Sequence, residues 1–589
     1  MIVFPHGGAD RRGGTHFVSE VQTPAKEVRL IPFEFNVTQA YVLEFGDNYI
    51  RFYKDNGQIL EDGSTTTPYE IVTTYTESQL SELHFAQSAD VMYICHNSHP
   101  PRKLSRTGHA AWALTSPTFL WGESVESGLF ETGTTYKIEK LGNTDWTEQG
   151  AFSAAPSVGA TFSADTAGTG TGVASIAGTS PWTATNGYPR TVAFYEQRLF
   201  FAGTSQKPQT IWGSVSASHL DFRSGTMADA SLEYAIATNR VNVIRWMQPS
   251  RDLIVGTGGG EFKVGRPPGE PLTPMNVMVT QQTTYGSWTL PPVQIGNAIL
   301  FTQRARRKLR EFSYQAQSDG YVAPDMTLLA EHITNGYIKD LDYQQEPDSV
   351  VWCCTSDGKL LSMTYERPED VIAWAQHKIG GDGEVESVAV ITNLTKDQLW
   401  VSVKRTINDT VTRYIEYIDP DLNVDSGITG AVSNATASVS GLDHLEGETV
   451  QVVINDSVFP DKTVSSGSID ISVPVGWTNV PIQIGLKYVS VLKTMRIEAG
   501  SQAGSAQGRK KRWNEVMVRL LNTTGVSING DQLPFRSSST PMNQGVAPFS
   551  GDKRVTNLGW DRDGIIEIRQ EQPLPMTILS VHGTLTTSD

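Results

Sequence analysis

The sequence predicts an all-β protein built around a β-propeller. Two observations predict this class. Apolar runs recur about every fifty residues, and apolar and polar residues alternate where helical periodicity is nearly absent. The recurring runs begin at Tyr41, Val91, Leu199, Leu253, Ile299, Val350 and Leu399. This period fits a propeller blade, a small sheet that cannot bury both faces alone, so we expect the blades to stack.

Residues 1–84 are expected to form an N-terminal β platform, which could itself supply a blade. Strands are predicted at 29–35, 41–45, 49–53 and from 68 onward. The Asn-Gly pair in residues 54–57 predicts a hairpin turn, because these residues accept positive φ. The spacing of Thr and Gln within residues 76–83 predicts a short capped helix.

The propeller itself is assigned to residues 85–132 and 186–420. Polar turns precede its apolar runs, for example at 196–198, 250–252 and 396–398. One step, from Val91 to Leu199, is about twice the usual length and includes residues rich in Gly, Thr and Ala. We therefore predict an inserted small β subdomain at 133–185, since closure entropy penalises a longer loop only weakly.

The last segment, residues 421–589, follows the periodic region and has a different residue pattern. Short strands are expected at 450–454, 469–473, 480–484, 516–521 and 565–569, with a Gly/Ser-rich loop at 499–508. This pattern favours a C-terminal β-sandwich or barrel-like domain.

Charge and cysteine content limit the function. A formal charge of −16 argues against a general nucleic-acid binder, though not against a channel through which DNA passes without sticking. The acidic surface could equally serve solubility alone. Three cysteines, Cys95, Cys353 and Cys354, predict reduced structural thiols in a reducing cytosol. Neither a signal peptide nor an apolar stretch of membrane-spanning length is expected.

Two basic clusters stand out. Residues 509–512 could contact a neighbouring subunit, form a solvated loop or contact DNA; they are Arg509, Lys510, Lys511 and Arg512. The second cluster, within 304–310, is expected in a turn between blade strands. There its charge would keep a sheet edge soluble or, as the sharper alternative, form a docking patch.

No constellation predicts catalysis, a cofactor or a metal site. Residues 258–260 are three glycines followed by a strand, so we interpret them as a hairpin turn. His96 and His99 lack further ligands at metal-binding spacing. The Asp-rich stretch 561–564 and the Ser-Asp-Gly stretch 356–358 are interpreted as turns. We therefore expect a protein that is not an enzyme.

Six stretches resemble one protein family. The chain is similar to the nozzle, or tail tubular protein B, of short-tailed bacteriophages over most of its length outside the insertion. The stretches are PHGGADRRGGTHFVSEV (5–21), RLIPFEF (29–35), FAQSADVMY (85–93), PRKLSR (101–106), FYEQRLFFAG (194–203) and AGSQAGSAQGRKKR (499–512).

The resemblance implies a structural virion protein, assembled in the host cytoplasm, that forms a homo-hexameric ring at the distal end of the tail. Such a nozzle docks to an adaptor (gatekeeper) ring, holds tail fibres or spikes, and conducts and gates DNA ejection. Family members carry a further stretch before residues 7–8, so this chain is either shorter there or lacks upstream adaptor contacts. Arg11 and Arg12 are nevertheless candidate partner contacts, together with residues 509–512.

Three alternatives stay open at this point. A receptor-binding or glycan-cleaving propeller of the tail would need aromatic and carboxylate side chains converging in one pocket. A portal-proximal adaptor would be expected to be small and helical. A cellular scaffold would make the resemblance a coincidence.

Overall fold

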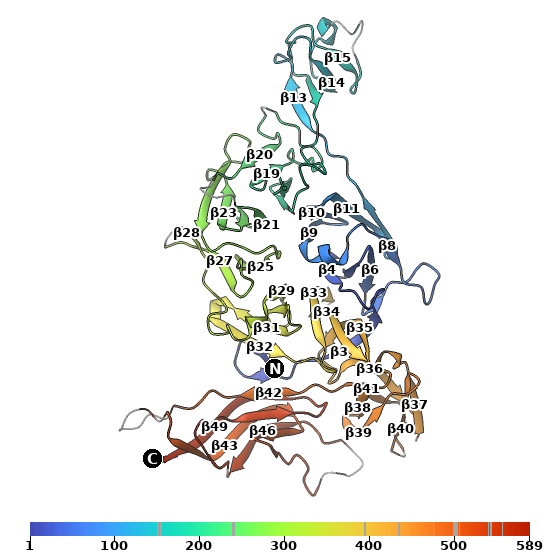
Figure 1. The fold of residues 1–589 in the computed structure, drawn as a ribbon, viewed down its shortest axis with the longest axis vertical. Helices are drawn as coiled ribbons and strands as arrows, with labels where there is room; N and C mark the ends of the chain where they lie inside the picture. Colours follow the sequence, from blue (N-terminus) through green and yellow to red (C-terminus); the bar gives the residue numbers. More distant parts are fainter. Residues whose placement is uncertain are drawn as a thin grey trace. The chain divides into compact units, whose positions relative to one another are not determined.

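The structure, a computed structural model, divides into two compact units, residues 78–328 and residues 1–77 with 329–589. Figure 1 shows that both units are built of strands. The structure describes residues 1–588 except 150–151, 153–155, 226, 238–241, 318, 394–395, 434–435, 475, 499–504, 506, 540, 542–544 and 557.

Within the described part of unit 78–328, four sheets have the form of propeller blades: four antiparallel strands joined in sequence order. Their strands are β9 (His84–Ser88), β10 (Val91–His96), β11 (His99–Gly108) and β12 (Ala111–Thr115); β17 (Thr191–Tyr195), β18 (Arg198–Ala202), β19 (Thr210–Gly213) and β20 (Leu232–Ala235); β21 (Ile244–Pro249), β22 (Leu253–Thr257), β23 (Gly260–Gly265) and β24 (Met278–Thr283); β25 (Val293–Ile295), β26 (Ala298–Thr302), β27 (Leu309–Gln315) and β28 (Gly320–Val322).

Neighbouring blades pack face to face, which explains the recurring apolar runs. Phe200 of β18 joins one buried cluster with Val255 of β22, whereas its neighbour Phe201 joins another with Tyr93 of β10. In the same way Ile254 of β22 packs with Phe301 of β26. The second strand of a blade is therefore buried on both faces, and its sequence is continuously apolar rather than alternating.

The insertion is a small sheet with its own core. It contains β13 (Gly122–Glu126), β14 (Thr135–Lys140), β15 (Thr161–Ser163) and β16 (Val173–Ala177), with the 3₁₀-helix η2 (Trp146–Gln149). The sheet order is β13-β16-β14-β15, so its first strand lies before residue 133, where the sequence placed the start. Phe130, Tyr136, Trp146 and Phe162 form the centre of its core.

The other unit contains three further blade-like sheets. The first has β29 (Ile338–Gln344), β30 (Val350–Thr355), β31 (Leu360–Glu366) and β32 (Val371–His377); the second has β33 (Glu384–Asn393), β34 (Lys396–Ile407), β35 (Thr410–Asp419) and β3 (Gly14–Glu20); the third has β4 (Arg29–Asn36), β5 (Gln39–Gly46), β6 (Tyr49–Lys54), β7 (Gly57–Gln58) and β8 (Glu70–Val72).

Buried polar groups connect these three sheets. The Ser387 hydroxyl donates to Asp340 Oδ2 at 2.6 Å and accepts from the Leu30 amide at 3.0 Å. Apolar clusters fill the remaining space between successive sheets. The predicted β platform thus supplies a blade-like sheet, β4–β8, and the prediction of an all-β propeller fold is confirmed.

The N-terminal strand β3 completes the blade begun by β33–β35. It pairs antiparallel with β35 and contacts β36 (Asp425–Val432) in parallel through His16 and Gly427. β3 and the segment before β36 approach each other so closely that only glycine fits at position 14. A Cβ on Gly14 would lie 2.0 Å from the Val424 carbonyl oxygen. A segment from one end of the sequence is thereby held inside a sheet contributed by residues near 420.

Two cores are found among the described residues of the C-terminal part. Around the first lie β36, β38 (Thr449–Ile454), β39 (Ser457–Thr463) and β41 (Val480–Leu486), with the two-stranded sheet of β37 (Thr436–Ser440) and β40 (Ser468–Ser472). The second fills a sandwich of two sheets. One contains β1 (Ile2–Val3), β2 (Ala9–Asp10), β49 (Thr577–Ser588), β43 (Lys510–Thr523), β46 (Phe549–Thr556) and β47 (Trp560–Asp561); the other contains β42 (Ser490–Lys493), β48 (Glu567–Gln570), β44 (Val526–Ile528) and β45 (Asp531–Gln532).

Several local predictions are confirmed. Residues 54–57 turn between β6 and β7, with Asp55 and Asn56 at positive φ, and the predicted short helix is the 3₁₀-helix η1 (Glu77–Glu82). The remaining 3₁₀-helices are η3 (Thr334–Gly336), η4 (Arg367–Glu369) and η5 (Asp443–Leu445). All three cysteines are free and buried. Among the described residues, no helix has the length and hydropathy that a membrane crossing requires.

Candidate functional site

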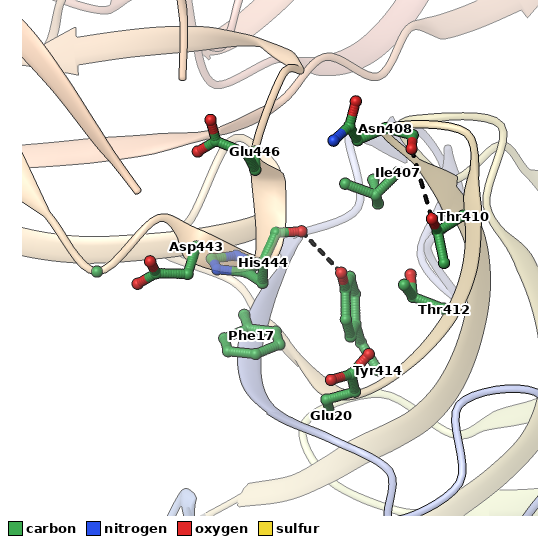
Figure 2. A pocket seen from close by; sticks show the side chains of 11 residues that line it. Phe17, Glu20, Ile407, Asn408, Thr410, Thr412, Tyr414, Asp443, His444 and Glu446 are labelled. Carbon is green, nitrogen blue, oxygen red and sulfur yellow. Dashed lines mark hydrogen bonds between the residues drawn. The ribbon is translucent and has the colours of Figure 1, made fainter. Parts of the chain in front are cut away.

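A pocket of about 450 Å³ lies in unit 1–77 with 329–589, where β3, the β34–β35 hairpin and the segment around η5 meet (Figure 2). Its walls combine aromatic, carboxylate and hydroxyl side chains. The lining residues are Phe17, Glu20, Ile407, Asn408, Thr410, Thr412, Tyr414, Gly441, Asp443, His444 and Glu446.

Local sequence shapes two of these walls. Asn408 and Asp409 form the tip of the β34–β35 hairpin with φ of 48° and 60°, the left-handed conformation that such residues tolerate. Gly441, with φ of 88°, begins the segment that carries η5. The hairpin and this segment therefore approach each other through turns that the sequence encodes locally.

The aromatic wall is held by internal contacts. Phe17 stacks on His444 with ring centroids 3.8 Å apart and meets Tyr414 edge to face at 5.2 Å. The Tyr414 hydroxyl donates to the His444 carbonyl oxygen at 2.7 Å, as Figure 2 shows. His444 Nε2 lies 3.0 Å from the Ser426 carbonyl oxygen. Because these rings already pack against one another, the pocket is preorganised. The ring faces that take part in this packing are largely unavailable for stacking on a ligand.

The charged groups of the pocket are carboxylates. Glu446 accepts the backbone amides of Ser466 and Gly467 at 2.9 and 2.8 Å, which fixes its orientation. Burial raises the pKa of Glu20 above its usual value and lowers the pKa of His444. His444 is therefore neutral near pH 7, and the lining favours a hydroxyl-rich or cationic ligand over an anion.

Arg11 and Arg12, predicted as partner contacts, are instead internal, with 5% and 3% of their surfaces exposed. Arg12 Nη1 donates to Asp425 Oδ1 at 2.8 Å, and Arg11 Nε donates to the Tyr488 hydroxyl at 2.9 Å. Both guanidinium groups lie 4.0 Å from the Tyr488 ring. In this fold the two arginines fix the N-terminal segment against the C-terminal part, and they are not available on the surface.

The basic run 509–512 is mostly strand rather than loop. Lys510, Lys511 and Arg512 pair with residues 586–588 at the end of β49. Lys511 is buried and its ammonium group donates to the Arg562 carbonyl oxygen at 2.9 Å, which corrects its assignment as a surface contact. Lys510 is exposed, whereas Arg509 and Arg512 are half-buried. Of the predicted loop 499–508, residues 499–504 and 506 lie outside the described residues.

The other predicted turns are found where expected. Glycines 258–260 connect β22 to β23. Of the basic cluster within 304–310, residues 304–308 form the turn between β26 and β27, whereas Arg310 lies in β27, is buried, and donates to the Ala323 carbonyl oxygen at 2.6 Å. Asp561 accepts the backbone amides of residues 562–564, so this stretch is a turn. His96 lies 3.8 Å from Glu82, and the described residues contain no group of three or more His, Cys, Asp or Glu side chains that could hold a metal ion.

The sequence did not predict the pocket. Phe17, Glu20, Tyr414 and His444 come from segments about 400 residues apart, and each residue type is ordinary in a β protein. An Asn-Asp pair such as 408–409 is typical of a hairpin turn, but it does not indicate which segment will lie beside the hairpin.

No protein-family model and no curated protein matches the chain. Solved structures that are similar include the Neurospora crassa Pan2 WD40 domain, with a TM-score of 0.36, 8% identity, and coverage of 69% of this chain and 95% of that one. BBS1N in complex with ARL6DN matches with a TM-score of 0.31 and 9% identity, over 71% and 99% of the two chains. A luciferin-regenerating enzyme gives 0.19 and 12%, over 38% and 89%. Because every one of these TM-scores is below 0.5, the fold is assigned from the strand pairing alone.

Proposed function

We propose that this chain is a structural, non-enzymatic protein of a bacteriophage tail, a subunit of a hexameric distal nozzle that conducts and gates DNA. The observation that carries the proposal is where the tail-protein-like stretches fall. Residues 5–21 span β2 and β3, residues 29–35 lie in β4, residues 85–93 overlap β9 and the first half of β10, and residues 194–203 overlap the end of β17 and all of β18. Most of these four stretches therefore lie in strands of the sheets, and Phe17 and Glu20 of the first stretch also line the pocket.

The strand pairing of these sheets suits a protein that must resist mechanical force. β2 pairs with β49, and β3 pairs with β35, so residues near the start of the chain are locked into two sheets made by the second half. Strand pairing of this kind must break as a unit before the segment can leave. A stiff wall is what a conduit under pressure needs, and tail fibres or spikes and the adaptor ring would attach to it.

The charge agrees with passage of DNA without binding. Each copy contributes a formal charge of −16, and a ring of acidic subunits repels phosphate over about 8 Å at physiological salt. The protein would be located in the virion tail after assembly in the host cytoplasm.

The test is the assembly state of the purified chain. Six chains of 64.4 kDa give a particle of about 390 kDa, measured by mass photometry, and electron microscopy should show a ring with a central hole. A chain that stays monomeric both alone and in extracts containing the other tail proteins would refute the proposal.

A second candidate function, glycan recognition by a tail protein, is favoured by the pocket of Figure 2. Three carboxylates, Glu20, Asp443 and Glu446, line this pocket together with the aromatic residues Phe17 and Tyr414. A glycan array probed with the intact chain tests this alternative, with Glu20→Gln as the variant and Glu70→Gln, on the exposed edge strand β8, as the control. If the array shows no binding that Glu20→Gln removes, the second function is rejected.

A further inference from the structure

A cluster of arginines around one tryptophan lies in unit 78–328. The Arg306 guanidinium carbon is 4.8 Å from the centre of the Trp288 ring, and that of Arg245 is 5.9 Å from it. Stacking on an aromatic ring restrains a guanidinium group through its face and does not use its N–H groups as donors to the ring. Trp288 therefore holds two cationic side chains in place.

Arg190 joins this cluster through the backbone. Its amide donates to the Gly203 carbonyl oxygen at 3.1 Å, and Gly203 lies against Ile244, whose carbonyl oxygen is 3.2 Å from the position of a Cβ on that glycine. Arg190 immediately precedes β17, and Arg245 is the second residue of the neighbouring β21. The positive charge of Arg245 contributes to lowering the pKa of Arg190, after burial, which fits their proximity.

Arg190 and Arg245 lack the partners that other enclosed arginines have. The Nε atoms of both are buried and have no hydrogen-bond partner in the described part of the chain. Arg102 and Arg106 also have an unbonded Nε, but Arg102 donates to the Ser116 hydroxyl at 2.6 Å and Arg106 pairs with Asp90 at 2.6 Å. Arg190 and Arg245 have no such bond among the described residues, and the one carboxylate whose charge raises the pKa of Arg190 is Glu82, which forms no hydrogen bond with it among those residues.

A buried Nε–H group without an acceptor is costly, because it has lost water without gaining a hydrogen bond. The cost is higher when a second cation lies beside it in a low-dielectric setting. The cluster is not sealed, however, since both side chains are half-buried and can be reached from solvent. An anion with several oxygens would supply the missing acceptors and neutralise the two charges together.

We infer that Arg190 and Arg245, with Arg306 held beside them on Trp288, form a binding site for an oxyanion, a phosphate, sulfate or carboxylate group. The site lies at the start of two adjacent first strands of blades, β17 and β21. This site is distinct from the carboxylate-lined pocket of the other unit, whose charge is of the opposite sign. The inference does not depend on the proposed function of the chain as a tail nozzle subunit.

The test titrates inorganic phosphate, sulfate and glucuronate into the intact chain at constant ionic strength, followed by calorimetry and by thermal unfolding. Saturable binding is expected for at least one of them. Arg190→Gln and Arg245→Gln should each weaken it by about 10- to 100-fold, the loss expected for one charge-assisted hydrogen bond. Arg307→Gln, which removes an exposed arginine from the same turn as Arg306, should leave binding unchanged.

A second readout separates binding from a structural role. Without anion, Arg190→Gln should unfold at the same temperature as the wild type or higher, because the substitution removes repulsion. If a glutamine variant fails to fold, Arg190→Lys keeps the charge but loses the planar fork, and weaker binding is still expected. Preference for glucuronate would identify a carboxylated ligand, and preference for phosphate or sulfate an esterified one. Absence of saturable binding to all three anions, or binding unaltered in both glutamine variants, overturns the inference.

Discussion

Replacing Asp425 with asparagine should destabilise the unit that contains the N-terminal segment more than almost any other single change of similar size. Asp425 is fully buried and accepts Arg12 Nη1 at 2.8 Å, the Thr15 amide at 3.1 Å and the Gly380 amide at 2.7 Å. Asparagine keeps the shape but removes the charge, so the buried Arg12 guanidinium loses its counterion. Breaking one side of a buried ion pair costs about 3–5 kcal/mol.

The assay is unfolding in urea, followed by tryptophan fluorescence, together with calorimetry. A loss of this size should lower the first unfolding transition by about 5–10 °C. Arg12→Met should have a similar effect, and the double variant Arg12→Met with Asp425→Asn should cost clearly less than the sum, because it leaves neither charge unpaired.

Lys487→Ala provides the matched control, since Lys487 and Glu571 form an ion pair in which both side chains are almost half exposed. Such a pair contributes at most about 1 kcal/mol. The reasoning is refuted if Asp425→Asn costs no more than this control, or if the two single effects simply add.

Three further predictions concern the blades. Excising residues 122–178 should leave the remaining blades folded, by calorimetry and circular dichroism, because Gly122 and Ala177 are paired neighbours and the insertion has its own core. Deleting residues 287–335 should instead abolish soluble expression, since Trp246 and Ile254 lose the sheet that covers them. Burial raises the pKa of Asp342 to about 7, so its ionisation opposes folding and stability should fall as pH rises from about 4 through 7. Asp342→Asn should therefore raise the unfolding temperature at pH 8 and flatten this slope, and a lower unfolding temperature at pH 8 would contradict it.

The sequence predicted the blades well because their signal is local. An interior strand packed on both faces must be apolar throughout, so the runs beginning at Tyr41, Leu199, Leu253 and Val350 fall in second strands of successive sheets. Turns were predicted for the same reason: the positive φ of Asn56 is a property of a few neighbouring residues. The long step between Val91 and Leu199 also marked the insertion, although not its first strand.

The positions of the candidate site residues were predicted poorly, because residues remote in sequence determine whether a charged side chain is exposed or buried. Arg11 and Arg12 were candidate partner contacts through the family resemblance, and Lys511 was one because it lies in a basic run. Each is enclosed by residues remote in sequence: Asp425 for Arg12, Tyr488 for Arg11 and Arg562 for Lys511. Nothing in the neighbouring sequence of a cation indicates whether a distant acceptor will meet it.

By itself, the sequence determined the repeating small sheets, the strand-rich C-terminal region and the acidic character, since periodicity, turn chemistry and net charge are properties of the chain read in order. Only the tertiary structure decided that β3 completes the sheet of β33–β35, that Phe17 and His444 share a pocket, and that the buried Nε atoms of Arg190 and Arg245 have no hydrogen-bond partner among the described residues. The physical reason is that each of these depends on which segments meet after chain closure, and the cost of an enclosed polar group exists only once its surroundings have formed.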